Sequence, residues 1–188
     1  MQDVPLMTSA TAATLGILGR YVRCDYRLTL LEVQKLVYFL KEAGESLPRT
    51  HFEKAPYGPY ADSLRQVLNR LEGHYLSGFG DATRNHPDTP ISLLPGAVEE
   101  AEGFLHMQPE TLKPFERVAN LIEGFETPYG LELLATVHWI VTREDPAASS
   151  DLAGVITAVH NWSPRKREFF KEPHIRVAWQ RLKDSEWI

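Results

Sequence analysis

Apolar residues recur along most of the chain at the spacing of an amphipathic α-helix. The clearest case is residues 29–45, where one broad stripe is apolar: Leu30, Leu31, Val33, Leu36, Val37 and Leu40. Thr29 can cap this helix together with Glu32, as a capping box, and Gly44 can end it. Residues 12–22 predict a helix that precedes it.

A second amphipathic pattern follows at residues 59–73, with Pro59 suited to the first helical turn and Gly73 to the end. We expect five residues from the inner faces of these two helices in the core: Leu36, Val37, Leu64, Leu68 and Leu71. Residues 76–92 contain several Gly and Pro turn points and no helical period. They predict a loop with a short strand on either side.

Helical spacing resumes after this loop and continues through the rest of the chain. The segments that show it are LLPGAVEEAEGFLHM, PETLKPFERVANLIEGF, PYGLELLATVHWIVTRED, SSDLAGVITAVHNW and EPHIRVAWQRLKDSEWI. The pattern contains no repeat and no long linker. We therefore expect a mainly α protein, a single compact multi-helix domain over residues 1–188 with a small β element of two short strands at most.

The composition is that of a globular, soluble protein, with 43% hydrophobic and 24% charged residues. No apolar run approaches the roughly 20 residues that span a bilayer. The first residues lack the basic segment of a signal peptide. Cys24 is the only cysteine, so an intrachain disulfide is impossible and a reducing compartment fits. These features predict a cytoplasmic protein.

Charge is unevenly distributed along the chain. Residues 1–96 hold ten acids and ten bases, residues 97–145 ten acids and three bases, and residues 146–188 five acids and seven bases. A conventional duplex-DNA binder would carry a long basic stripe, which this chain lacks. The acidic middle segment suits a cationic partner, or a protein that normally holds a polyanion. Ordinary solvated helix faces are the alternative.

The residues with chemical potential do not form a recognisable catalytic or metal-binding pattern. The histidines never fall at positions i and i+4 of one helix, and a single cysteine cannot make a thiolate site. Pairs such as Glu99 with Glu102 are common on solvated helix faces. No glycine-rich phosphate loop follows a strand. We expect no catalytic residue, no cofactor and no metal.

Aromatic residues give a stronger signal around the second helix. Tyr57 and Tyr60 lie on either side of a Gly-Pro turn, and Tyr75 and Phe79 lie in a glycine-punctuated exit. Any one of these rings is more typical of a core position. Four rings clustered around two turns favour a recognition surface, because loops carry function more often than scaffold helices do.

Several segments resemble the C-terminal domain of the DarG antitoxins of DarT–DarG toxin–antitoxin systems. They are VQKLVYFLKEAGE, YGPYADSLRQVLNRLEGHYLSGFGD, LPGAVEEAEGFL, LIEGFETPYGLELLATVHWIV and RKREFF with HIRVAWQRL. The likeness runs from about Leu28 to the end, and the block at residues 57–81 is long and specific. The pairing of KLVYFL with YGPY is also similar, more distantly, to Panacea-type (SocA-like) antitoxin domains.

The resemblance implies a helical antitoxin domain, without the macrodomain that removes ADP-ribose from DNA in the full-length antitoxin. The toxin of that family is an NAD-using transferase that puts ADP-ribose on thymidine in single-stranded DNA. The resemblance therefore implies a direct inhibitor that is not itself an enzyme. Its expected partners are the cognate DarT-like toxin and the macrodomain of the same full-length chain, with no membrane and no direct nucleic acid.

We expect inhibition by nucleic-acid mimicry, because carboxylates of the acidic segment can replace phosphates and turn-mounted aromatics can occupy base-stacking pockets. The expected partner-binding residues are Tyr57, Tyr60, Tyr75, Phe79, Asp81, Glu123 and Glu126.

Two other functions stay open. The segment NWSPRKREFFK, in which Arg165, Lys166 and Arg167 adjoin Phe169 and Phe170, would suit a DNA-binding adaptor or autorepressor of a toxin–antitoxin operon. A small hydrolase or transferase is the other alternative, although no constellation of residues supports it.

Overall fold

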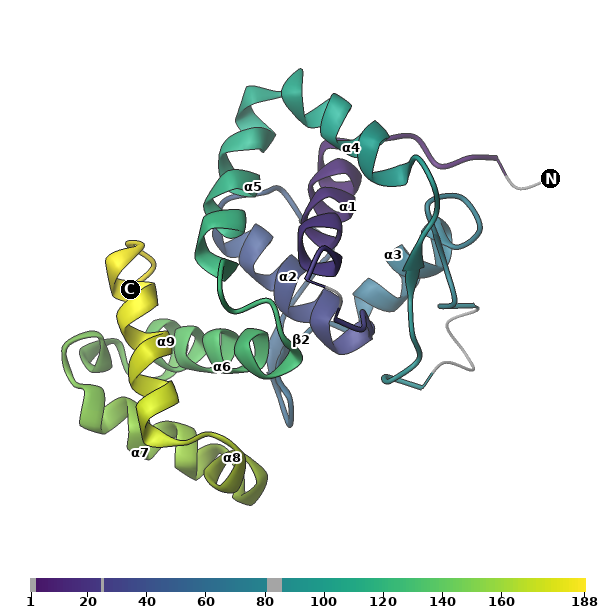
Figure 1. Cartoon of the computed structure of the whole chain (residues 1–188). Coiled ribbons are helices and arrows are strands. Elements are labelled where there is room, and N and C mark those ends of the chain that lie inside the picture. Colours follow the sequence, from purple (N-terminus) through teal and green to yellow (C-terminus); the bar gives the residue numbers. More distant parts are fainter. Residues whose placement is uncertain (1–2, 25, 81–85) are drawn as a thin grey trace.

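The computed structural model of the chain describes residues 3–24, 26–80 and 86–188. This part of the chain is mainly helical, which confirms the fold class (Figure 1). The helices are α1 (Ser9–Val22), α2 (Leu30–Glu42), α3 (Ser63–Leu71), α4 (Ala97–His106), α5 (Pro109–Ile122), α6 (Pro128–Trp139), α7 (Leu152–Trp162), α8 (Pro164–Phe169) and α9 (Glu172–Asp184). The strands are β1 (Glu53–Ala55), β2 (Gly58–Tyr60), β3 (Leu76–Ser77) and β4 (Ser92–Leu93).

Helix α1 packs against α2, α4 and α5 in the N-terminal part of the molecule. Two glycines allow this close packing. A Cβ atom on Gly19 would lie 2.8 Å from Val98 Cγ1, and one on Gly16 would lie 3.0 Å from side-chain atoms of Leu105 and Phe115. Both distances are shorter than normal carbon–carbon contact. Helices α4 and α5 therefore rest almost directly on the backbone of α1.

Helix α6 connects this part to the C-terminal helices, because it contacts α2 as well as α9 (Figure 1). Helix α7 in turn contacts α8 and α9. The Tyr38 hydroxyl on α2 and His138 Nδ1 on α6 share a buried hydrogen bond of 2.6 Å. Burial lowers the pKa of His138 to about 3, so the ring stays neutral at the α2–α6 contact.

The C-terminal part holds all four tryptophans of the chain, and each has a cation over its ring. Such contacts let long basic side chains cover apolar surface while their charged ends stay near water. The pairs are Arg143 with Trp139, Lys54 with Trp162, Lys183 with Trp179 and Arg117 with Trp187.

The segment before α3 differs from the prediction of a helix that starts at Pro59. Residues 53–60 form an antiparallel hairpin, in which Lys54 pairs with Pro59 and Ala55 with Gly58. Strand β2 packs on α2 and α6. Gly58 has φ +99° and is buried there, a conformation that L-residues with a side chain rarely adopt. This packing removes Pro59 from the helix, which begins four residues later at Ser63.

The loop at residues 76–92 carries a short strand at each end, as predicted, where β3 and β4 pair antiparallel. The expectation of two strands at most is wrong, because the β1–β2 hairpin adds a second small sheet. All five predicted core residues are buried: Leu36, Val37, Leu64, Leu68 and Leu71 are at most 3% exposed.

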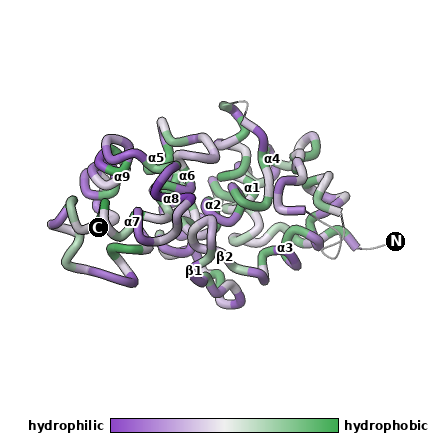
Figure 2. Tube along the Cα trace, turned by 90° about the horizontal axis from the view of Figure 1, so that it is seen from below, coloured by the Kyte–Doolittle hydropathy of each residue, from purple (hydrophilic) through white to green (hydrophobic). Residues whose placement is uncertain are grey.

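Hydrophobic and hydrophilic stretches alternate along the trace in Figure 2, as expected for helices with one buried face. The buried hydrophobic residues of the N-terminal and C-terminal parts belong to one core cluster. None of the helices formed by the described residues has the length and hydrophobicity needed to cross a membrane.

Replacing Leu68 by alanine tests the core assignment of α3. Leu68 is fully buried, so Leu68→Ala should lower the free energy of unfolding by about 2–5 kcal/mol through lost burial and a residual cavity. Urea denaturation of both proteins measures the change. Asn69→Ala, at an exposed position of the same helix, is the control and should change stability far less. Equal stability of Leu68→Ala and the unmodified chain would contradict the assignment.

Candidate functional site

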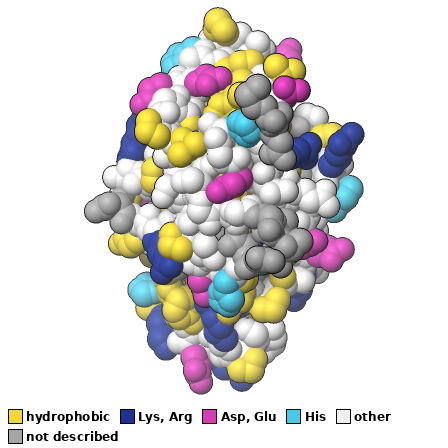
Figure 3. Space-filling model, turned by 90° about the vertical axis from the view of Figure 1, so that its right-hand side faces the viewer, with side chains coloured by type: hydrophobic (Ala, Val, Ile, Leu, Met, Phe, Trp, Pro, Cys, Tyr) yellow, Lys and Arg dark blue, Asp and Glu magenta, His cyan; other side chains and the backbone are white. Residues whose placement is uncertain are grey.

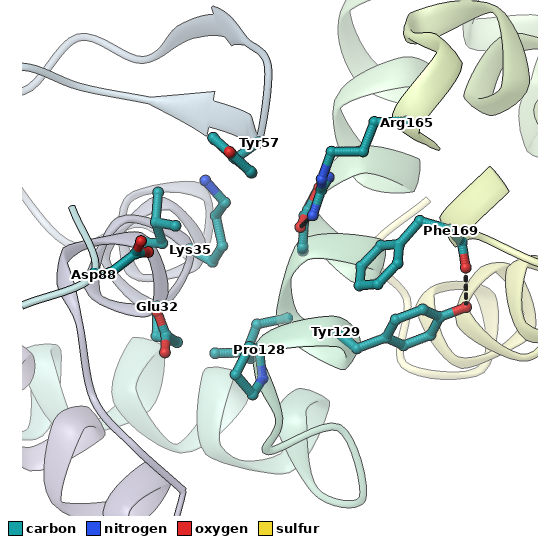
Figure 4. A pocket seen from close by; sticks show the side chains of 11 residues that line it. Glu32, Lys35, Tyr57, Asp88, Pro128, Tyr129, Arg165 and Phe169 are labelled. Atoms are coloured by element: carbon teal, nitrogen blue, oxygen red, sulfur yellow. Dashed lines mark hydrogen bonds and ion pairs between the residues drawn. The ribbon is translucent and has the colours of Figure 1, made fainter. Parts of the chain in front are cut away.

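A pocket of about 210 Å³ lies where α2, the β1–β2 turn, α6 and α8 come together (Figure 4). It combines charged, aromatic and apolar side chains, the mixture typical of ligand sites. The residues that line it are Leu31, Glu32, Lys35, Tyr57, Asp88, Pro128, Tyr129, Leu131, Glu132, Arg165 and Phe169. A second hollow, of about 360 Å³, is lined mainly by apolar and hydroxyl side chains, with Arg70 as its one charged group, and suits proton chemistry less well.

Glu132 is the electrostatic centre of the pocket. It projects from α6, is 8% exposed, and accepts two hydrogen bonds from the Arg165 guanidinium, at 2.7 Å (Oε1) and 3.1 Å (Oε2). The Lys166 ammonium donates to the same Oε1 atom at 2.6 Å and to Thr136 Oγ1 at 3.2 Å. A buried carboxylate is stable only when paired in this way. The network therefore attaches α8 to α6.

Lys166 is fully buried behind Glu132, between the rings of Trp162 and Phe170, whose centroids lie 5.1 and 5.0 Å from its Nζ atom. Burial lowers the pKa of Lys166, and the nearby Glu132 carboxylate opposes that shift. The 2.6 Å contact with Glu132 and the two aromatic faces favour the charged ammonium.

Lys35 lies in a different environment, although it lines the same pocket. Its side chain comes from α2, is 2% exposed, and donates to the Pro59 carbonyl oxygen at 3.0 Å. Burial lowers the pKa of Lys35 from 10.5 to about 7; the charge of Glu132 opposes this shift and that of Lys166 adds to it. Lys35 is thus an amine that is partly neutral near pH 7.

Glu32 is the buried carboxyl group on the α2 side, at 4% exposure. The Thr29 hydroxyl donates a hydrogen bond to Glu32 Oε2. The observed geometry differs from the predicted capping box. The Thr29 side chain forms a hydrogen bond with the Glu32 side chain and none with the backbone N–H groups of the first helical turn. Burial raises the pKa of Glu32, with the Thr29 hydrogen bond opposing the shift. This carboxyl group therefore retains a proton to higher pH than an exposed glutamate.

Aromatic rings form the exposed edge of the pocket. The Arg165 guanidinium lies 4.7 Å from the centroid of the Tyr57 ring and 4.6 Å from that of Phe169. Tyr57 is 41% exposed and Phe169 is 42% exposed, so part of each ring remains open to a ligand. Tyr129 holds Phe169 in place in two ways. The two rings pack edge to face with their centroids 4.9 Å apart, and the Tyr129 hydroxyl donates a hydrogen bond to the Phe169 carbonyl oxygen at 3.2 Å. Flat faces beside a planar cation suit a nucleobase.

The described residues contain no group of three His, Cys, Asp or Glu side chains that could hold a metal ion. The chemistry that this pocket offers is instead proton transfer and charge stabilisation by Glu32, Lys35 and Glu132.

The structure separates the four predicted aromatic residues. Tyr57 lines the pocket, whereas Tyr60 is half-buried in β2 and lines a different hollow beside Arg49 and Ser63. Tyr75 is 5% exposed and its hydroxyl donates to the Pro5 carbonyl oxygen at 3.1 Å; Phe79 is 2% exposed. Tyr75 and Phe79 pack in the core, so the prediction of one exposed surface bearing all four rings is wrong.

The predicted acidic contacts also lie away from the pocket. Glu123 is exposed, and the Glu126 carboxylate accepts a hydrogen bond from the Gly124 backbone N–H at 2.6 Å, so it stabilises a local turn. Both line a shallow hollow together with Arg20 and Arg23. Asp81 lies outside the described residues. On the face shown in Figure 3, acidic and basic side chains are interspersed, without a broad field of one sign.

Sequence reasoning missed Lys35, Glu132 and Glu32 as members of one site, because they come from segments about 100 residues apart. A signal was nevertheless present. Lys35 interrupts the apolar stretch VQKLVYFL, and Glu132 interrupts LELLATVHWIV. Charged residues inside otherwise apolar helix faces are rarely buried without a function or a partner. Arg165 and Phe169 were noted, but only as part of a short basic patch.

Comparison with known proteins gives relatives of one kind. No family model matches the chain. A DNA ADP-ribosyl glycohydrolase of Thermus aquaticus is 46% identical over 182 residues, which are 97% of this chain and 48% of that protein. Proteins of the same name from Mycobacterium bovis and Mycobacterium tuberculosis are each 36% identical over 156 residues, 81% of this chain and 43% of those proteins. The chain spans about half the length of the curated relatives it matches.

These names correct the functional interpretation of the sequence. The relatives are named as glycohydrolases, which are enzymes, and not as antitoxins. The prediction of an antitoxin C-terminal domain that inhibits a DarT-like toxin by DNA mimicry is therefore wrong, as is that of a chain with no enzymatic role. The alternative of an operon autorepressor falls with them. The resemblance assigned this helical part a role separate from the removal of ADP-ribose, and the names of the relatives make no such distinction.

Replacing Glu132 by glutamine tests the charge network. Glu132→Gln leaves the buried Lys166 ammonium without its counter-charge, so the free energy of unfolding should fall by about 3–5 kcal/mol. Urea denaturation measures this change. Adding Lys166→Met should restore much of the loss, because the double variant no longer buries that charge. The exposed Glu116→Gln is the control. A Glu132→Gln protein as stable as the unmodified chain would show that the network is not ionised.

The lowered pKa of Lys35 predicts a pH dependence of stability. Between about pH 7 and pH 10.5 the unfolded chain binds a proton on Lys35 that the folded chain does not, so stability rises with pH in that window. Lys35→Met removes this contribution, and the difference in unfolding free energy between the two proteins should change by up to about 1.4 kcal/mol per pH unit. Denaturation at pH 7, 8 and 9 measures it. Parallel pH profiles would contradict a low pKa.

Proposed function

We propose that this chain is part of a DNA ADP-ribosyl glycohydrolase and takes part in the removal of ADP-ribose from DNA. The observation that carries the proposal is the 46% identity, over 97% of the chain, to a protein of that name. The chain spans about half of that protein, so the proposal concerns one part of the enzyme. The chemistry of the pocket indicates whether this part contributes catalytic residues.

The pocket fits the needs of glycoside hydrolysis. Breaking a ribosyl bond requires a proton for the leaving group and negative charge near the cationic ribosyl carbon. Glu32, whose pKa burial raises, is suited to donate the proton. The Glu132 carboxylate, held by Arg165 and Lys166, can supply the negative charge. The bond from the ribosyl carbon to DNA breaks, a water oxygen forms the new bond, and a proton from that water restores Glu32.

The exposed edge of the pocket suits the nucleotide part of such a substrate. The rings of Tyr57 and Phe169 offer open faces on which a nucleobase can stack, and Arg165 adds a cation beside them. This proposal and the expectation of no direct nucleic-acid contact make opposite predictions for DNA binding. Fluorescence anisotropy of a labelled oligonucleotide, with and without Tyr57→Ala, distinguishes them.

About half of each relative lies outside the part that this chain matches, which is long enough for the macrodomain that we expect as a partner in a full-length protein. We place the enzyme in the cytoplasm, which a lone cysteine and an intracellular DNA substrate favour. Contact with a DarT-like toxin remains a prediction that a pull-down can test.

An ADP-ribosylated oligonucleotide tests the function. The chain, alone and joined to the remaining part of the Thermus aquaticus relative, is incubated with this substrate, and released ADP-ribose is measured by chromatography. We expect release by the joined protein, and a rate at least about a hundredfold lower for Glu32→Gln, the lower end of the loss typical when a general acid is removed. Glu116→Gln, at an exposed position of α5, should keep the full rate.

The outcomes separate two levels of the proposal. No release by the joined protein would overturn the function itself. Release that is unaffected by Glu32→Gln would place the chemistry in the other part of the enzyme and would remove the catalytic role of this pocket.

A further inference from the structure

The hollow of about 360 Å³ takes no part in the function proposed above. It lies between α1, α2, α3 and the N-terminal arm, residues 3–8, and its volume is in the range of small-molecule sites. Three core side chains, Val37, Leu64 and Leu71, form its floor and are at most 3% exposed. No described residue lines both this hollow and the pocket at α8, so the two are separate sites.

The threonines in the wall add little polarity to this hollow, because their hydroxyl groups are bonded locally. The Thr14 hydroxyl donates to the Ala10 carbonyl oxygen at 2.7 Å. Thr8 Oγ1 accepts from the Thr11 N–H at 3.2 Å, and the two hydroxyls share a hydrogen bond of 3.0 Å. These groups are satisfied without a ligand, so the wall is apolar in character except at Arg70.

Hydrogen bonds also hold the edges of the hollow in place. The Tyr75 hydroxyl donates to the Pro5 carbonyl oxygen at 3.1 Å and so fixes the arm. The Lys41 ammonium donates to the Thr50 carbonyl oxygen, and the Thr50 N–H donates to the Leu47 carbonyl oxygen at 3.1 Å, which fixes the loop after α2. A ligand that enters a preformed hollow does not have to order its walls.

Arg70 is the one charged group among the described residues that line the hollow. It lies in the last turn of α3, is exposed, and forms no ion pair with another described residue. A guanidinium can bind a carboxylate through two parallel hydrogen bonds. An unpaired arginine beside an apolar hollow therefore suits a ligand with an apolar body and an anionic end.

We propose that this hollow binds an aliphatic carboxylate, with the hydrocarbon chain between α1, α2 and α3 and the carboxylate on Arg70. Burial of the chain supplies affinity, and the arginine fixes the orientation of the ligand. The proposal does not depend on the glycohydrolase function, because it concerns residues that the other pocket does not use.

Isothermal titration calorimetry of the chain with butanoate, hexanoate and octanoate tests the proposal. We expect saturable binding, with an affinity that rises by up to about fourfold for each added methylene group until the chain fills the hollow. Octanamide has the same chain and a neutral end. It should bind at least about tenfold more weakly than octanoate, because it cannot form the charged contact with Arg70.

Two pairs of variants locate the site. Arg70→Gln should remove the difference between octanoate and octanamide, whereas Arg176→Gln, at an exposed position of α9, should keep it. Val67→Trp should fill the hollow from α3 and abolish binding of both ligands, whereas Gln66→Trp, at the neighbouring exposed position, should not. Circular dichroism checks that the tryptophan variants fold, and the Arg70→Gln result does not depend on them.

Three results would overturn the proposal. The first is the lack of saturable binding of every acid. The second is binding that neither Arg70→Gln nor Val67→Trp changes, since the acid would then bind elsewhere. The third is equal binding of octanoate and octanamide to the unmodified chain. Sedimentation with anionic phospholipid vesicles, without binding of a free acid, would belong to the first result and would indicate a membrane surface instead.

Discussion

The pairing of the buried Glu132 carboxylate with two cations is the interaction on which the pocket depends. Its two oxygens receive the Arg165 guanidinium and the Lys166 ammonium, so the short helix α8 is fixed to α6 by charge as well as by packing. The fully buried Lys166 ammonium could not be held at this place without the carboxylate, because the cost of its desolvation would be uncompensated. This attachment and the contacts of Tyr129 together place Phe169 at one edge of the pocket.

Polar residues of α2 hold the other wall in a similar way. Gln34 makes two hydrogen bonds to the Ala61 backbone, at 2.9 Å to its carbonyl oxygen and at 2.8 Å from its N–H, and Lys35 bonds the Pro59 carbonyl oxygen. An isolated hairpin of three-residue strands would be unstable in water. Here the helix supplies the missing partners, and Tyr57 at the turn is thereby held facing α8. The pocket is formed by two short elements that are each held by a buried side chain of a long helix.

Periodicity in the sequence was sufficient to predict the longer helices and the core positions Leu36, Leu64 and Leu68, because burial of one helix face is a local property. It did not predict α8, a helix of six residues that is held on α6 by contacts between residues far apart in the sequence. It was not sufficient for Pro59, which has a good local preference for a helix start but is drawn into a strand by contacts with α2 and α6. Tyr75 and Phe79 show the same limit, since flanking glycines indicate a turn but not which side of it faces the core. The pocket could not be predicted as a unit because its members lie far apart along the chain.

Because of where its tryptophans lie, the conformation of this chain can be followed by intrinsic fluorescence without any added label. The four indoles are confined to residues 139–188, each under a lysine or arginine side chain, and Trp162 lies over the same Lys166 that binds Glu132. When tryptophan is excited selectively, intrinsic fluorescence therefore reports on the C-terminal helices and the inner wall of the pocket, because the helices around α1 contain tyrosine but no tryptophan. Loosening of α8 from α6 would move Lys166 away from the Trp162 ring and so change the emission of Trp162, even while the helices around α1 stay folded.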